Sequence, residues 1–424
     1  MKKIRKIFLI IVIGLGLLVY FHNFNNYPAT RGLDSHDHIE YIEYLVDKNR
    51  IPRADEGLQM YQPPLYYYFS SRIYILGEVA GVDPLKFVQL VGFLSSLGII
   101  LLSYEILRVY FKDKFLIYGS LLFVIFLPIL VYEANVITSE TLFGFLATLA
   151  IYLISVWKDK LSGRRSLFLG VIVGASLLTK YTGVFLFASV IVYYVYGYLR
   201  DKELKIIRSG VVFVVACLVV CGWFYVRQFI LFGNPFILSN DPSLFPYRQY
   251  PGYRDIHFYT NLEGILPLNV FGAEGESFWG GTYNCLWVDT HNTFLPIMEF
   301  SKAGALVIYL GLLPTYLLVR GFIRAIRLGV KGKRKKYLFL VVYSVVLFGG
   351  YVFYTYKLPF GSSIKTFYFL SAVSCWAVFF GLGFEKMLKW SKEAKYLFLG
   401  LLVLLVGLIV KLYWYQSWWL NIGE

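Results

Sequence analysis

Residues 28–69 read PATRGLDSHDHIEYIEYLVDKNRIPRADEGLQMYQPPLYYYF and form the densest polar run in a largely apolar chain. Four apolar residues within it recur at helical spacing and predict an amphipathic helix from Asp34 to about Asp47: Ile39, Ile42, Leu45 and Val46. A polar set three, four and seven residues apart shares another face of this helix: Asp34, Asp37, His38 and Tyr41. Such a helix fits a membrane surface, with its carboxylates turned toward a cavity. We expect this segment to be an active-site loop.

The composition is that of a membrane protein and excludes an ordinary soluble domain. Hydrophobic residues make up 58% and aromatic residues 19% of the 424 residues, and the mean hydropathy is +0.61. Several apolar runs reach the ~20 residues that a membrane-spanning helix needs. The net charge of +15 is spread over short loops between these runs, so we expect no nucleic-acid partner.

The chain begins with MKKIRK and the apolar run IFLIIVIGLGLLVYF, which resembles a signal peptide. No small-residue cleavage site follows in HNFNNYPATR, so we expect an uncleaved first span that enters from the cytoplasmic side. Two later segments are ambiguous. Residues 64–81 fit either a span or a second surface helix, and residues 166–199 fit either one long helix or two short ones. Clear spans are predicted at 85–109, 114–132, 137–156, 209–227, 303–320, 337–356, 365–384 and 395–414.

The positive-inside rule resolves both ambiguities. If 64–81 lies on the surface and 166–199 forms two spans, the inner segments hold 27 of the 41 Lys and Arg and six acids. Changing the assignment of only one of these two segments would place the basic run RAIRLGVKGKRKK outside, against the positive-inside rule. We therefore predict an all-α polytopic membrane protein with about eleven spans, its N-terminus inside and its C-terminus outside. Residues 1–424 would form a single domain with long external loops at 23–84 and 228–302.

The four cysteines show neither a zinc pattern nor a disulfide framework. Cys217 and Cys221 lie four apart in an apolar run and are expected to be small core residues; only Cys285 falls in a long polar loop. The phosphate-binding pattern GxxxxGK[ST] is absent, so an ATP-binding loop of that kind is not expected.

Asp34 is the first candidate for chemistry, because a carboxylate in a dehydrated cleft can remove a proton from a hydroxyl. The alternative is structural: Asp34 or Ser35 would cap the helix. A cap explains one acid but leaves Asp37 and His38 beside it unexplained. The trio His36, Asp37 and His38 could also form a metal site. Alternating residues of a helix point to different sides, however, so at most two of the three could bind one ion. Metal therefore stays the weaker alternative.

Glu133 and Glu140 flank the outer junction of the third and fourth spans in VYEANVITSETLFGFL. Glu140 would lie in the first turn of its helix, where a negative charge interacts favourably with the helix dipole, and this alone could explain an acid there. An ionisable residue at the outer end of a span is also a candidate site residue. Four cations lie at outer span ends, where snorkelling alone would explain any one of them. Together they suggest a bound anion such as a lipid phosphate: Lys180, Arg227, Lys357 and Lys365.

The loop GLDSHDHIEYIEYL…RIP…YQPPLYYYF resembles the first external loop of GT-C glycosyltransferases, the group of protein O-mannosyltransferases and lipid A aminoarabinose transferases. Further similar segments follow in order over most of residues 1–385: TSETLFGFLATLAIYL, GASLLTKYTG, RQFILFGNPF, SFWG and YKLPFGSSIKTFYFL. Ser35 stands where the family has a Glu after its first Asp. The WWDYG-type signature of oligosaccharyltransferases is absent.

The resemblance implies inverting transfer of a sugar from a polyprenyl-phosphate donor to an acceptor hydroxyl of a protein, lipid or glycan on the outer face. Asp34 would match the catalytic Asp and Glu140 the second external acid, while Lys357 and Lys365 fall where the family holds the lipid phosphate. Asp37 and His38 would orient acceptor or sugar. A lipid or sugar transporter or flippase is the alternative, but transporters place ionisable residues near mid-membrane, whereas these gather at the outer rim.

Overall fold

The computed structural model describes residues 2–157, 162–237, 254–268, 270, 277–291, 294–295, 297–330, 335–359 and 363–416. Over these ranges the regular structure is helical throughout, which confirms the all-α prediction. The helices are α1 (Lys2–Asn26), α2 (Ser35–Lys48), α3 (Leu65–Val79), α4 (Pro84–Tyr110), α5 (Lys114–Ile125), α6 (Pro128–Glu133), α7 (Glu140–Trp157), α8 (Gly163–Thr179), α9 (Gly183–Asp201), α10 (Leu204–Phe232), α11 (Ile256–Thr260), α12 (Phe278–Trp287), α13 (Ile297–Val330), α14 (Lys335–Lys357), the 3₁₀ helix η3 (Thr366–Ala372), α15 (Val373–Met387) and α16 (Lys392–Tyr413).

Eight helical segments of the described chain are long and apolar enough to cross a membrane. They are α4, α7, α9, α10, α13, α14, the continuous η3–α15 segment and α16. Two helices at further predicted spans are shorter, with 12 residues in α5 and 17 in α8, so the predicted count of about eleven spans is not confirmed. The protein is nevertheless a multi-pass membrane protein.

The two ambiguous segments fold as the charge distribution favours. Residues 166–199 form two helices, α8 and α9, because the backbone of Lys180 is extended and interrupts the helical path. Residues 64–81 form α3, which has only 15 residues and packs against α2 and α4. At about 1.5 Å per residue, α3 is too short to span a bilayer.

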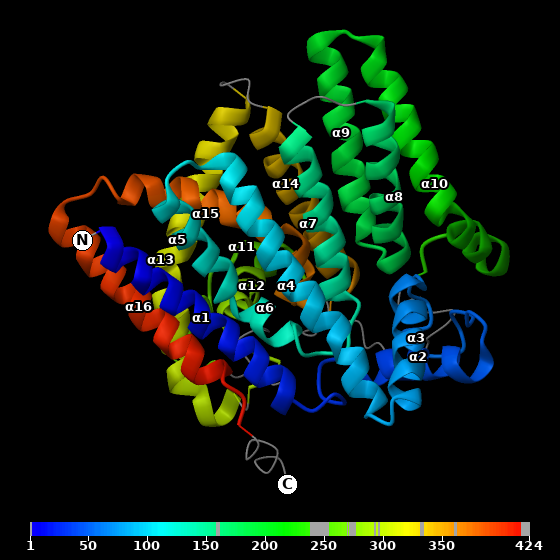
Figure 1. Cartoon of the computed structure of the whole chain (residues 1–424), viewed down its shortest axis with the longest axis horizontal. Coiled ribbons are helices and arrows are strands. Elements are labelled where there is room, and N and C mark those ends of the chain that lie inside the picture. The colour runs from blue at the N-terminus through cyan, green and yellow to red at the C-terminus, as the bar shows by residue number, and fades with distance from the viewer. Residues whose placement is uncertain are drawn as a thin grey trace.

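Figure 1 shows how the helices place the first loop. Helices α8, α9 and α10 stand together at the upper right, and α2 and α3 lie at the lower right beside the lower end of α4. Helix α1 runs alongside α16, where Asn23 Nδ2 donates to the Tyr413 carbonyl oxygen at 2.7 Å. The first loop is thus carried at one end of the bundle.

The apolar stripe of α2 packs on protein. Ile39, Ile42 and Leu45 are buried, and they join a cluster with residues of α3 and α4 that includes Tyr67 and Val88. We expected this stripe to lie on the membrane surface, and instead α3 and α4 cover it. Packing on two helices fixes the direction of the opposite, polar face of α2 more firmly than contact with lipid would.

Helices α13 and α15 cross closely at two glycines. A Cβ on Gly383 of α15 would overlap the Leu317 carbonyl oxygen, and a Cβ on Gly321 of α13 would overlap that of Phe379. Small residues at a crossing allow two backbones to approach, which is the usual device of helix packing in membranes. Because α15 continues from η3, this crossing also anchors the segment that follows Lys365.

Candidate active site

The polar face of α2 borders a cavity of about 350 Å³. The cavity is walled by α2, by the loop after it, by the turn between α6 and α7, by the end of α8, and by the segments around Leu358 and Lys365. Its ionisable acid, lysine and histidine residues are four acids, two lysines and one histidine: Asp34, Asp37, His38, Glu133, Glu140, Lys180 and Lys365. Six of the eight site residues expected from the sequence are among them, all except Arg227 and Lys357.

Asp34 sits in a strained backbone turn at the start of α2. Its φ is 60°, in the left-handed region that residues other than glycine rarely adopt, and Gly32 two residues earlier has a φ of 149°. The Asp34 side chain makes no capping hydrogen bond to the helix, so the alternative that Asp34 serves as a side-chain cap is wrong. The Ser35 hydroxyl donates to the Arg31 carbonyl oxygen at 3.4 Å. No capping hydrogen bond of the Asp34 side chain offsets the cost of this backbone conformation. Strain of this kind is typical of functional positions.

The Asp34 carboxylate is paired with a lysine from the far end of the sequence. Lys365 Nζ lies 3.2 Å from Asp34 Oδ2; the lysine side chain is 7% exposed and the aspartate 42%. Burial alone would raise the pKa of Asp34, but Lys365 beside it holds that pKa below its ordinary value. The carboxylate is therefore ionised and able to accept a proton.

Glu140 and Lys180 form a second ion pair in the same cavity. Glu140 Oε1 and Lys180 Nζ are 2.8 Å apart, and the two side chains are 3% and 10% exposed. Glu140 is the first residue of α7 and Lys180 directly follows α8, so the ends of two helices bring the charges together. Removing one partner of so buried a pair would leave an uncompensated charge.

His38 is a neutral, fixed member of the site. Its Nδ1 lies 2.7 Å from the Tyr67 hydroxyl, and the two rings stack with centroids 5.7 Å apart. Burial, assisted by the charge of Lys180, lowers the pKa of His38 to about 3. Asp37 also lines the cavity, whereas Tyr41 is fully buried and stacks on Tyr67 outside it.

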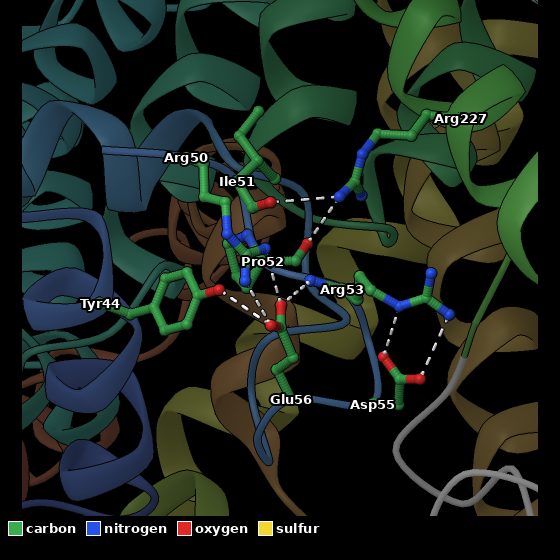
Figure 2. A network of polar contacts seen from close by, with 8 residues as sticks. All are labelled: Tyr44, Arg50, Ile51, Pro52, Arg53, Asp55, Glu56 and Arg227. Carbon is green, nitrogen blue, oxygen red and sulfur yellow. Dashed lines mark hydrogen bonds and ion pairs between the residues drawn. The ribbon is translucent and has the colours of Figure 1, made fainter. Parts of the chain in front are cut away.

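Arg227 and Lys357 do not line the cavity, unlike Lys180 and Lys365. Arg227 instead donates from Nη2 to the carbonyl oxygens of Ile51 at 3.1 Å and Pro52 at 3.0 Å (Figure 2). Lys357 is exposed, with its ammonium 5.8 Å from the ring centroid of Phe353. The position of a cation at a span end predicted its depth, but not the direction of its side chain.

The loop after α2 is closed by a polar network centred on Glu56 (Figure 2). The Glu56 carboxylate accepts hydrogen bonds from Tyr44 Oη at 2.9 Å, from Arg50 Nη2 at 2.6 Å and from the Arg53 amide at 2.6 Å. Together with Arg227, this network shapes the chain that leads to Tyr61 and Gln62. Those two residues line the cavity, and the Tyr61 carbonyl accepts from Tyr181 at 3.0 Å.

The segment that carries Lys365 is held by the second external loop. Thr366 Oγ1 donates to the carbonyl oxygen of Cys285 at 2.7 Å, and the carbonyl oxygen of Ile364 lies 2.9 Å from His291 Nε2. The thiol of Cys285 also reaches the Ile364 carbonyl, at 3.3 Å. Contacts on both sides of Lys365 therefore fix its backbone. Within this loop, residues 238–253, which include most of YPGYRD, lie outside the described residues, as do 269, 271–276, 292–293 and 296.

Sequence reasoning missed several cavity residues. Tyr354 and Tyr368 line the wall, their hydroxyl oxygens are 3.1 Å apart, and the Lys180 ammonium lies 5.8 Å from the ring centroid of Tyr368. Tyr368 falls inside YKLPFGSSIKTFYFL, so that motif contained the signal, but one tyrosine among many aromatic residues does not stand out. The described residues contain no group of three or more His, Cys, Asp or Glu arranged to hold a metal ion.

Residues 61–224 match the sequence profile of the dolichyl-phosphate-mannose-protein mannosyltransferase family. No curated protein sequence matches the chain. The fold is similar to that of ArnT from Cupriavidus metallidurans bound to undecaprenyl phosphate, with a TM-score of 0.57 and 15% identity over 94% of this chain. The apo state of the same ArnT gives a TM-score of 0.57 and 13% identity over 92% of this chain. It is also similar to the oligosaccharyltransferase AglB from Archaeoglobus fulgidus in complex with an inhibitory peptide and a dolichol-phosphate, with a TM-score of 0.56 and 14% identity over 97% of this chain.

These similarities show that the chain has the GT-C glycosyltransferase fold, as its motifs led us to expect. The chain is shorter than the proteins that it resembles. The matched region spans 61–63% of ArnT and 56% of AglB.

Proposed function

We propose that this protein is a membrane glycosyltransferase that moves a sugar from a polyprenyl-phosphate donor to an acceptor hydroxyl. The observation that carries the proposal is one cavity in which an ionised Asp34 lies beside two buried lysines, Lys180 and Lys365. The fold and the mannosyltransferase profile support the same class of reaction. The lipid phosphates named for the ArnT and AglB structures support a polyprenyl-phosphate donor.

In the proposed reaction, Asp34 acts as general base. It takes the proton of the acceptor hydroxyl as that oxygen attacks the anomeric carbon from the face opposite the phosphate. The bond from the anomeric carbon to the phosphate oxygen breaks, a new bond to the acceptor oxygen forms, and the configuration inverts. Because the leaving group is already an anion, it needs fixed positive charge more than it needs a proton.

Lys180 and Lys365 supply that charge. Both ammonium groups are nearly enclosed by protein, where a cation stabilises a phosphate more strongly than it does in water. Glu140 holds Lys180 in place, and Asp37 with the neutral His38 would orient the acceptor or the sugar. Arg227 acts indirectly by holding the first loop, and Lys357 contributes little. We further propose that the cavity opens on the external face and that residues 1–424 form one catalytic domain.

The test is sugar transfer by membranes that carry wild type or Asp34→Asn, using a panel of radiolabelled polyprenyl-phosphate sugars. Asparagine tolerates the left-handed backbone, so the variant should fold normally. We expect transfer to fall by about 10²–10⁴, the usual contribution of a general base. Equal transfer by both proteins would remove Asp34 from the mechanism. Movement of labelled lipid across the membrane without transfer would favour a flippase.

A further inference from the structure

Glu133, the last residue of α6, is a buried acid that takes no part in the two ion pairs of the cavity. It lines the cavity and is only 4% exposed. Within the part of the chain that the structure describes, its carboxylate makes neither a hydrogen bond nor an ion pair, unlike those of Asp34 and Glu140. A buried carboxyl group without a hydrogen-bond partner is costly, so one that faces a cavity points to a ligand.

The backbone around Glu133 is fixed before any ligand binds. The Val136 amide donates to the Glu133 carbonyl oxygen at 3.3 Å, and Gln89 Nε2 of α4 donates to the Asn135 carbonyl oxygen at 2.7 Å. The turn also packs tightly on α4, since a Cβ on Gly92 would lie 3.2 Å from the Ala134 carbonyl oxygen. A group held this firmly can select the geometry of a ligand.

The neighbours of Glu133 define which part of a ligand it would meet. Lys180 and Lys365 lie close enough to act electrostatically on its carboxylate, as does Glu140. Burial, together with Glu140 and Asp289, nevertheless raises the pKa of Glu133, so its carboxyl group is held protonated. A neutral carboxyl group adds little to a phosphate that the two lysines already hold, whereas hydroxyl groups can donate hydrogen bonds to its carbonyl oxygen. In a polyprenyl-phosphate sugar, the group bonded directly to the phosphate is the sugar.

We propose that Glu133 is a specificity-determining residue that accepts hydrogen bonds from hydroxyl groups of the sugar being transferred. This inference rests on the proposed function and adds the residue that would distinguish one sugar from another by its hydroxyl groups. Glu133 would hold the ring so that its anomeric carbon faces the acceptor, while the lysines bind the phosphate. It removes no proton and forms no bond in the reaction.

The experiment compares two lipids on the full-length protein in detergent. The affinities of undecaprenyl phosphate and of a panel of undecaprenyl-phosphate hexoses and pentoses are measured for wild type, Glu133→Ala and Glu133→Gln. Glu40→Gln is the matched control, because Glu40 is an exposed acid on the outer side of α2. For the sugar that wild type prefers, we expect the ratio of sugar-lipid to bare-lipid affinity to fall about tenfold in Glu133→Ala. The fall should be smaller, about threefold, in Glu133→Gln, which keeps a neutral acceptor.

The affinity for undecaprenyl phosphate itself should stay unchanged in both variants, because the protonated Glu133 side chain carries no charge that acts on the phosphate. A donor that lacks the recognised hydroxyl should bind wild type and Glu133→Ala equally. An unchanged ratio in folded Glu133→Ala, or in Glu133→Gln where the alanine variant does not fold, would overturn the inference while leaving the proposed function intact. Failure of wild type to bind either lipid would instead overturn the proposed function, and this inference with it.

Discussion

Lys365 donates a hydrogen bond to Asp34 across a sequence separation of 331 residues, with Nζ 3.2 Å from Oδ2. The pair joins the strained turn at the start of α2 to the segment that enters η3. One contact therefore places the proposed base next to a proposed phosphate-binding cation. It also sets the charge state of that base, which leads to a prediction on pH.

Lys365→Gln should move the acid limb of the kcat/KM profile to higher pH. Burial raises the pKa of Asp34 and Lys365 lowers it, so removing the lysine leaves the effect of burial less opposed. The base is active when ionised, and in wild type its pKa lies below the ordinary 3.8. The profile is measured as transfer against pH, since kcat/KM reports groups of the free enzyme.

Lys357→Gln is the comparison for that profile, because Lys357 lies outside the cavity lining. Its acid limb should coincide with that of wild type, and its KM for donor should change less than about twofold. The same shift in both variants would mean that the effect comes from net charge, and the Asp34–Lys365 pair would not be its cause.

The Glu140–Lys180 pair should behave as a coupled unit in a double-mutant cycle. Glu140→Gln and Lys180→Met each leave a buried charge without its partner, and each should cost about 3–5 kcal/mol in the free energy of unfolding. The double variant removes both charges and should cost less than the sum. Chemical denaturation in detergent gives the three values. Purely additive losses would show that the pair is not coupled.

Arg227→Lys should loosen the first loop without touching the cavity. The Arg227 guanidinium group donates to the carbonyl oxygens of both Ile51 and Pro52, and a lysine ammonium group does not have this planar geometry. A hydrogen bond from a charged donor contributes about 1.5–3 kcal/mol to stability, so the substitution should weaken the attachment of the loop. Limited trypsin digestion should therefore cut faster after Arg50 and Arg53, and the KM for donor should rise more than kcat falls. Arg208→Lys, an exposed substitution near the other end of α10, should leave digestion unchanged.

Gly383→Ala should destabilise the protein by about 1–3 kcal/mol or more, because its Cβ would overlap a backbone oxygen of α13. Gly400→Ala is the matched control in α16, where a Cβ meets no atom within 4 Å. There the better helix propensity of alanine should leave stability unchanged or slightly higher. Thermal unfolding of both variants in the same detergent tests the α13–α15 crossing. Equal unfolding temperatures would contradict it.

The parts of the site that could be predicted from sequence are those encoded by local pattern. The spacing in α2 placed Asp34, Asp37 and His38 on one face, and the acid-bearing start of α7 identified Glu140. The break at Lys180 followed from charge counting over whole loops. These features depend on periodicity and topology, which a single sequence displays.

What could not be predicted depends on contacts between distant segments. Arg227 and Lys180 look alike in sequence, as cations at outer span ends, but one reaches loop carbonyl oxygens and the other a carboxylate. The pairing of Asp34 with Lys365, and the lack of a partner for Glu133, appear only when the helices are packed. The lengths of the apolar runs also misled the count of spans, because the helices that form there, α5 and α8, are shorter than a typical membrane-spanning helix.

The left-handed backbone of Asp34 narrows what this position can become. A saturation library at residue 34 would meet two separate filters. Survival of the fold would favour glycine, asparagine and aspartate, the residues that accept a positive φ. Activity would then retain only the one with an ionised carboxylate. Glutamate, the usual conservative replacement for aspartate, should fail at the first filter, so geometry and chemistry together leave this position with a single solution.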